Sequence, residues 1–290
     1  MSTELTVVIP IYNEEESLPI FLPEVILYCT ENNYQLILVN DGSGDRTRDV
    51  ISKFSTTEVV KVIHHKINMG YGGAIKTGIA HCSTKYVVTI DADGQHYLGD
   101  IQKLHKKLLE TDADMVIGSR KGSANATYLR GIGKNILRSV AKLLMNFSIY
   151  DINSGMKLYR SDLVKQYLKL TPNTMSFSDI ITLIFINNKH LVVEEPIQIK
   201  KRIKGKSTIG VRTAFETFIE IINIVILFNP AKIFLPIAFT LFTFGLVWGI
   251  YFFVQGLGIS IGGSTLILAG LLIFLLGLIA EQLSAIRKNQ

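Results

Sequence analysis

The first 200 residues alternate between short apolar runs and longer segments with helical spacing. Runs such as Leu5–Pro10 and Gln35–Asn40 are typical of strands buried on both faces, and Glu14–Cys29 between them predicts a helix. Further strands are predicted over Val59–Ile63, Tyr86–Ile90, Met115–Gly118, Met156–Tyr159, Leu191–Glu195 and Ile197–Lys201, and further helices over Asp45–Phe54, Gly72–Cys82, Ile101–Glu110, Leu129–Phe147 and Phe177–Asn188. This order predicts an α/β fold with a mostly parallel sheet that is covered by helices on both faces.

Polar residues cluster where three of these predicted strands end. Pro10–Glu14 follows the first strand, Asn40–Ser43 the second and Asp91–His96 the fourth. The carboxyl ends of parallel strands meet at one edge of a sheet, where ligands bind, so the three turns are expected to converge. Taken singly, each turn has a plainer interpretation; Asp41 and Ser43, for example, are also good helix caps.

The carboxyl-terminal region has a different pattern. No Asp, Glu, Lys or Arg occurs between Ile233 and Ala280. Two segments, about 233–254 and 265–283, are long enough to cross a bilayer. The alternative is a buried helical hairpin of a soluble protein. Preceding them, Val211–Leu227 is amphipathic, which predicts either a helix resting on the membrane surface or an ordinary core-facing helix.

Charge and composition constrain the setting of the chain. It has 290 residues with a formal net charge of +6. Lys232 precedes the first span, and Arg287 and Lys288 follow the second, so both flanks are expected on the cytoplasmic side. The amino terminus lacks a signal-peptide pattern, which predicts a cytosolic domain over residues 1–209 and a juxtamembrane helix over 210–230. Its two cysteines are isolated, and no nucleic-acid partner is expected.

A glycine-rich segment at Gly70–Thr77 does not support a nucleotide-triphosphate or dinucleotide site. Ile75 stands where a phosphate loop needs its second glycine and where the dinucleotide fingerprint needs glycine or alanine. The glycines more simply permit a tight turn into the next helix.

Several motifs together resemble glycosyltransferase family 2 with a GT-A fold. They occur in order at Pro10–Glu14, Asn40–Thr47, Asn68–Gly70, Asp91–His96 and Gly118–Arg120. The later segments Asp151–Lys157 and Arg202–Ser207 are similar to the branch that transfers hexoses to dolichyl or polyprenyl phosphate. Asn40 replaces the aspartate that is common in the family, and Tyr97 replaces the usual proline.

The resemblance implies roles for individual residues. Asp91, Asp93 and Gln95 match positions that hold Mg²⁺ or Mn²⁺ on the donor diphosphate, and Asp93 is assigned to catalysis with Arg120 and Arg202. The nucleotide-sugar site is expected at Pro10, Tyr12, Asn13, Glu14, Asp41, Asp91, Asp93 and Gln95. The acceptor phosphate is expected at Arg120, Arg130, Arg202, Lys206 and Ser207. The alternative for the basic cluster Lys200–Ser207 is a solvated loop.

The residue types suit sugar transfer between two phosphates. Carboxylates bind Mg²⁺ or Mn²⁺ together with substrate phosphates, and arginines bind phosphate oxygens in a planar fork. The predicted function is inverting transfer of mannose or glucose from GDP or UDP to dolichyl or undecaprenyl phosphate at the plasma membrane. Another family 2 transferase of cell-envelope polysaccharide or glycolipid synthesis and an inactive membrane scaffold are the alternatives. Assembly into a homo-oligomer through the hairpin is left open beside a monomer.

Overall fold

The computed structural model describes residues 3–120, 149–200 and 229–288, together with residues 219, 222, 225 and 226. The chain divides into two compact units. One comprises Met1–Lys142 and Phe147–Glu220, and the other comprises Leu143–Asn146 and Ile221–Gln290. The helices predicted over Leu129–Phe147 and Val211–Leu227 lie outside the described residues, apart from single positions of the second.

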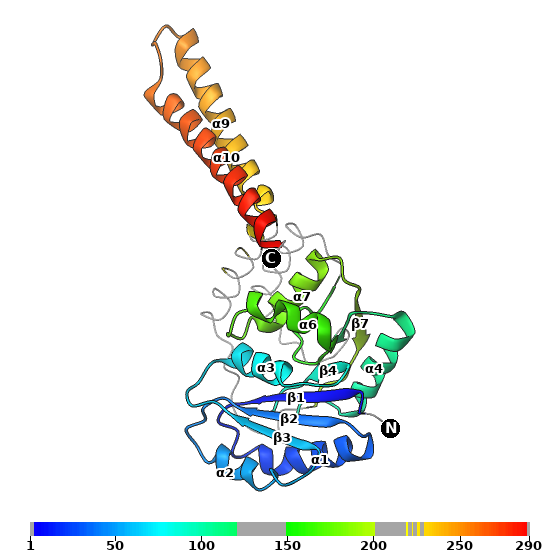
Figure 1. The fold of residues 1–290 in the computed structure, drawn as a ribbon. Coiled ribbons are helices and arrows are strands. Elements are labelled where there is room, and N and C mark those ends of the chain that lie inside the picture. Colours follow the sequence, from blue (N-terminus) through cyan, green and yellow to red (C-terminus); the bar gives the residue numbers. More distant parts are fainter. Residues whose placement is uncertain are drawn as a thin grey trace. The chain divides into compact units, whose positions relative to one another are not determined.

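A seven-stranded sheet with the order β3-β2-β1-β4-β6-β5-β7 forms the larger unit (Figure 1). Its strands are β1 (Leu5–Ile11), β2 (Gln35–Asn40), β3 (Val60–His64), β4 (Tyr86–Thr89), β5 (Met115–Ser119), β6 (Lys157–Arg160) and β7 (Val192–Pro196). Only β6 runs antiparallel to its neighbours, so the mostly parallel sheet predicted from the sequence is confirmed.

Helices cover both faces of this sheet. They are α1 (Leu18–Glu31), α2 (Thr47–Ser52), α3 (Tyr71–Ala80), α4 (Gly99–Thr111), α6 (Ser161–Tyr167), the 3₁₀ turn η2 (Leu168–Leu170) and α7 (Phe177–Asn187). Leu5, Val7 and Ile9 of β1 share one core with α1 and α4. The intervening residue Val8 faces α3, where it contacts Gly78. Because alternate residues of β1 face opposite sides, both faces are packed and all seven of its residues are buried.

Two segments differ from the sequence prediction for local reasons. The first helix begins at Leu18 rather than Glu14, because Asn13 adopts a left-handed conformation (φ 53°) and Glu14–Ser17 forms a turn. The strand predicted over Ile197–Lys201 was wrong for the described residues. Pro196 ends β7, and Ile199 makes only a single bridge, to His96.

The second unit contains two long apolar helices, α9 (Ala231–Val254) and α10 (Ile261–Lys288). They pack directly against each other through glycines: a Cβ at Gly245 would lie 2.8 Å from the Gly263 carbonyl oxygen, and one at Gly270 would lie 2.9 Å from that of Ala238. Only 11% and 17% of their most apolar windows are buried within the described chain. Both helices are long and apolar enough to cross a membrane, and this low burial argues against the soluble-hairpin alternative.

Candidate active site at the sheet edge

The three polar turns lie on neighbouring parallel strands. The order β2-β1-β4 brings together the turns that follow Ile11, Asn40 and Thr89. Ile11 pairs with Asn40 in the sheet, and the Asp41 amide donates to the Ile11 carbonyl (2.8 Å). Pro10 lies within β1 rather than after it. The sheet therefore brings the turn residues of the predicted nucleotide-sugar site to one edge.

The turns after β1 and β2 are joined by hydrogen bonds. The Asn13 amide donates to Ser43 Oγ (3.0 Å), and Asn13 Oδ1 accepts from the Gly44 amide (2.9 Å). The Glu14 amide donates to Thr47 Oγ1 (2.9 Å). Tyr12 stands beside them with half of its surface exposed (50%). Asn13, through its backbone and side chain, and Glu14, through its backbone, thus hold the two turns together, while the Tyr12 ring is accessible to a ligand.

Asp41 is 2% exposed, and its carboxylate is engaged by the protein itself. Oδ1 accepts from His65 Nδ1 (2.6 Å) and from the Met69 amide (2.8 Å), and Oδ2 accepts from the Gly70 amide (2.8 Å). His65 Nε2 continues the network to Thr77 Oγ1 (2.9 Å). Asp41 therefore fixes the loop between β3 and α3, and His65 belongs to this network.

The acidic motif after β4 is held from several directions. Tyr71, the first residue of α3, donates from its hydroxyl to Asp91 Oδ1 (2.8 Å). His96 Nε2 lies 3.5 Å from Asp91 Oδ2, and the buried His96 Nδ1 has no partner among the described residues. Asp93, 5% exposed, accepts the Gln95 amide at Oδ1 (3.1 Å). The motif is a packed turn rather than a free acidic loop.

These contacts set the charge state of Asp91. Burial acts to raise its pKa, but the hydrogen bond and charge of His96, the hydrogen bond from Tyr71 and the charge of Arg120 lower it, and the net pKa lies below the usual value. The same interaction, together with burial, raises the pKa of the Tyr71 hydroxyl well above its usual value. Asp91 is consequently ionised at neutral pH, and Tyr71 remains a hydrogen-bond donor.

Gln95 ties the motif to the segment that leads into the basic cluster. Its backbone oxygen accepts the Lys200 amide (2.8 Å), and its side-chain nitrogen donates to the Lys200 carbonyl (3.3 Å). The Lys200 ammonium pairs with Glu24 (3.3 Å) and lies 4.8 Å from the centre of the Tyr97 ring. The chain therefore enters the predicted phosphate-binding segment next to the acidic motif.

Arg120, expected in catalysis and at the acceptor phosphate, is bound to an acidic partner. Its Nε and Nη2 donate to the two carboxylate oxygens of Asp151 (2.6 Å each), and Nη2 also donates to Asn153 Oδ1 (2.7 Å). Burial acts to raise the pKa of Asp151, but the hydrogen bonds and charge of Arg120 outweigh it and hold that pKa below the usual value. Arg130, Arg202, Lys206 and Ser207 lie outside the described residues.

Asp91 and Asp93 are suited to bind a divalent cation whose remaining ligands come from a substrate. Both offer hard oxygen ligands, and the lowered pKa of Asp91 keeps that carboxylate charged. Over the described part of the chain, no group of three or more His, Cys, Asp or Glu residues could enclose an ion. Mg²⁺ is commonly held in this way, by one or two carboxylates plus substrate phosphates.

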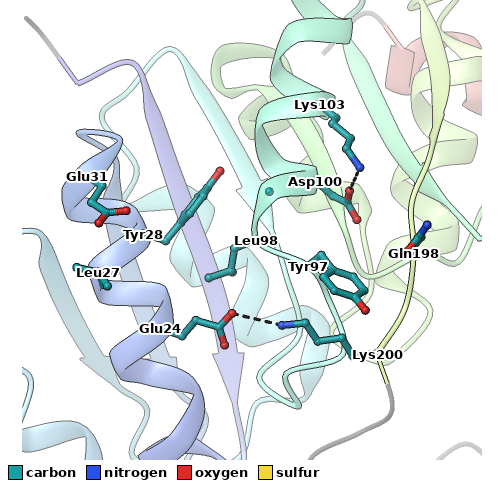
Figure 2. Close-up of a pocket in the computed structure, with 11 residues that line it drawn as sticks. Glu24, Leu27, Tyr28, Glu31, Tyr97, Leu98, Asp100, Lys103, Gln198 and Lys200 are labelled. Carbon is teal, nitrogen blue, oxygen red and sulfur yellow. Dashed lines mark hydrogen bonds and ion pairs between the residues drawn. The ribbon is translucent and has the colours of Figure 1, made fainter.

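A separate groove of about 550 Å³ lies between α1 and α4 (Figure 2). It is lined by Tyr28 and Glu24 of α1, Asp100 of α4 and Lys200. Neither Asp91 nor Asp93 lines it, so it is not part of the acidic site.

The sheet order and the acidic turn at its edge define a GT-A fold followed by an apolar helical hairpin. Residues 6–168 match the family model for glycosyl transferase family 2, and the chain belongs to this family. Residues 229–286 match the model of the GtrB C-terminal hairpin. The resemblance deduced from the motifs is thus confirmed, and so is the presence of the hairpin.

Curated relatives match over the catalytic part. A dolichyl-phosphate beta-glucosyltransferase of Trichomonas vaginalis is 32% identical over 178 residues, covering 54% of this chain and 54% of the relative. An undecaprenyl-phosphate 4-deoxy-4-formamido-L-arabinose transferase of Photorhabdus laumondii is 31% identical over 170 residues, covering 57% of this chain and 52% of the relative. The match thus spans about half the length of each of these two relatives.

A solved structure supports the fold. Glucosyl-3-phosphoglycerate synthase from Mycobacterium tuberculosis, crystallised with Mn²⁺, UDP and phosphoglyceric acid, superposes with a TM-score of 0.61. The two chains share 15% identity, with 77% of this chain and 79% of the other covered. At this identity the likeness concerns the fold alone.

Proposed function

We propose that this protein is a membrane-bound inverting glycosyltransferase that moves a hexose from a nucleotide-diphosphate sugar to a polyprenyl phosphate. The observation that carries the proposal is the joining, in one chain, of a family 2 domain bearing Asp91 and Asp93 to a GtrB-type hairpin. The names of the relatives, which act on dolichyl and undecaprenyl phosphate, support the choice of acceptor. Glucose from UDP-glucose is the first donor to test, and mannose from GDP-mannose the second.

The reaction requires little proton transfer. An oxygen of the lipid phosphate attacks C1 of the sugar while the bond from C1 to the diphosphate breaks, and the nucleoside diphosphate leaves with the electron pair. The second pKa of a phosphate monoester is about 6, so the acceptor is largely ionised at pH 7 and needs no general base. Attack from the face opposite the leaving group inverts the anomeric carbon.

The acidic turn is assigned to the donor and the arginines to the acceptor. Asp91 and Asp93, together with Gln95 of the same turn, would hold Mg²⁺ or Mn²⁺ against the donor diphosphate. A bound cation stabilises the negative charge of the leaving diphosphate. Arg120, with Arg130 and Arg202, would neutralise phosphate charge. Flanking positive residues favour a plasma-membrane hairpin with the catalytic unit and both termini in the cytoplasm.

Transfer to lipid provides the test. The full chain in detergent would be incubated with radiolabelled UDP-glucose or GDP-mannose, undecaprenyl or dolichyl phosphate, and MnCl₂. We expect one lipid-linked hexose whose anomeric configuration is opposite to that of the donor. Asp93→Asn should abolish transfer, whereas Asp49→Asn, the same change on the exposed side of α2, should not. No lipid-linked sugar with any donor would refute the proposal, and polymer from one donor would indicate a polysaccharide synthase.

A further inference from the structure

Lys157, on β6, is fully buried, yet its ammonium group faces oxygens rather than a carboxylate. Nζ donates to the Ile152 carbonyl (2.6 Å), to Thr182 Oγ1 (2.8 Å), and to both the hydroxyl (2.6 Å) and the carbonyl of Ser178. Within the described part of the chain, no acidic side chain forms an ion pair with it. A buried ammonium is costly unless hydrogen bonds replace its hydration, which this cage of oxygens does.

The environment of Lys157 shows how strongly it is desolvated. Burial lowers the pKa of the ammonium to about 7, although the charges of Asp179 and Asp151 act to raise it and Arg120 acts to lower it. Arg120, Asp151 and Asp179 are the charged groups around it. An apolar side chain would fill this position at a lower free-energy cost. The role of the lysine is therefore to be sought in the segments that its hydrogen bonds connect.

Those hydrogen bonds join α7 to the loop before β6. Lys157 holds the Ile152 carbonyl of that loop, while Ser178 Oγ donates to the Ser154 carbonyl (2.6 Å). Ser178 and Thr182 both belong to α7. Two alternate carbonyls of the loop are therefore held against one helix.

The next residue of this loop touches the acidic motif. A Cβ on Gly155 would clash with Asp91 Oδ2, so the bare Gly155 backbone packs against that carboxylate. Thr89, two residues before Asp91, donates from Oγ1 to the Gly155 carbonyl (2.9 Å). The position of Gly155 consequently limits where the Asp91 carboxylate can stand.

We propose that Lys157 is a positioning residue for the donor site: it fixes the loop Ile152–Gly155, and Gly155 in turn holds Asp91 in the orientation that binds the cation and the donor diphosphate. The inference rests on the proposed function for the identity of that ligand. It differs from a purely structural role because it predicts a change in cation affinity in protein that is still folded.

The test compares Lys157→Met and Gly155→Ala with a matched control, Lys76→Met. Lys76 also binds oxygens of a neighbouring loop, the Thr171 carbonyl (2.9 Å) and Asn173 Oδ1 (2.8 Å). The dissociation constant for Mn²⁺ in the presence of UDP or GDP would be measured by calorimetry on the full chain, well below each Tm. Lys157→Met and Gly155→Ala should each weaken Mn²⁺ binding by roughly 10-fold or more, as for other residues that orient metal ligands. Lys76→Met should lower Tm alone.

The double variant decides whether the two residues act through one route. If Lys157 works through Gly155, the combined loss should be much smaller than the product of the single losses. Folded Lys157→Met with unchanged Mn²⁺ affinity, or fully multiplicative losses, would overturn the proposal. If Lys157→Met does not fold, Ser178→Ala replaces it, and unchanged affinity there overturns the proposal equally. Wild-type protein that binds Mn²⁺ and nucleotide but makes no lipid-linked sugar refutes only the proposed function.

Discussion

Replacing Asp41 by asparagine tests whether this carboxylate is a structural clamp or a ligand for the nucleotide. Motif resemblance assigns Asp41 to the nucleotide-sugar site, but its carboxylate is 2% exposed and accepts hydrogen bonds from His65, Met69 and Gly70. If these bonds are its main role, Asp41→Asn should destabilise the catalytic unit even when no donor is present.

The size of the effect follows from the three hydrogen bonds. Asparagine keeps one acceptor oxygen and turns the other into a donor, so at least one amide hydrogen loses its bond to residue 41; the Gly70 amide would keep its second acceptor, Asn68 Oδ1 (2.9 Å). Losing a hydrogen bond to a charged acceptor costs about 1.5–3 kcal/mol, and the remaining bonds weaken because their acceptor becomes neutral. We expect a total loss of roughly 2–4 kcal/mol. At about 2–4 °C per kcal/mol for a unit of this size, Tm should fall by roughly 4–16 °C.

The assay is thermal unfolding of the full chain in detergent, without ligand, with Asp49→Asn as the matched control on an exposed site. The donor dissociation constant would be measured on the same samples at low temperature. A Tm equal to that of the control, combined with much weaker donor binding, would refute the clamp and restore Asp41 to the nucleotide.

Three further outcomes are expected. Tyr71→Phe removes a hydrogen bond that lowers the pKa of Asp91. Cation binding needs the ionised carboxylate, so Mn²⁺ affinity is lost as pH falls through that pKa. The loss should begin at higher pH in the variant, which a pH series of Mn²⁺ titrations would show. Gly270→Leu forces a side chain against the Ala238 carbonyl and should separate α9 from α10. A disulfide between cysteines engineered across the helix pair should then no longer form, whereas it should still form in the control, Leu272→Ala at an exposed position. Chelation by EDTA should abolish transfer and MnCl₂ should restore it, whereas transfer that persists in EDTA would remove the cation from the mechanism.

Most of the sheet was predictable because its strands are buried on both faces. Continuous apolar runs such as Gln35–Asn40 have no strong alternative, and β2 has these same limits in the structure. Element ends were less predictable, since they depend on single backbone features. The left-handed Asn13 delays α1, and Pro196 stops β7. The 7-residue helix α6 was missed because it is too short to show a period.

The contents of the candidate site were only partly predictable. Strand order brings Asp41 and Asp91 to one edge, which parallel connections imply. The partners of these residues come from loops whose approach has no periodic signal: His65, Tyr71 and Gly155 engage them across 20 to 64 residues of sequence. Lys157 ends the motif Asp151–Lys157, but the sequence does not predict its burial, because a lysine is usually exposed.

Three separated segments meet at Asp91, and their contacts fix the carboxylate that the proposed function assigns to the cation. Tyr71 holds one carboxylate oxygen, His96 lies beside the other, and Gly155 closes the space behind it. A cation bound by few protein ligands gains affinity when those ligands are already oriented, because no ordering is left to be done on binding. The immobilised carboxylate would therefore compensate for a small number of protein ligands. Variants that loosen any one of the three contacts should therefore reduce Mn²⁺ affinity while the protein remains stably folded. Mn²⁺ titrations of Tyr71→Phe and Gly155→Ala, set beside the Tm of each variant, would test this.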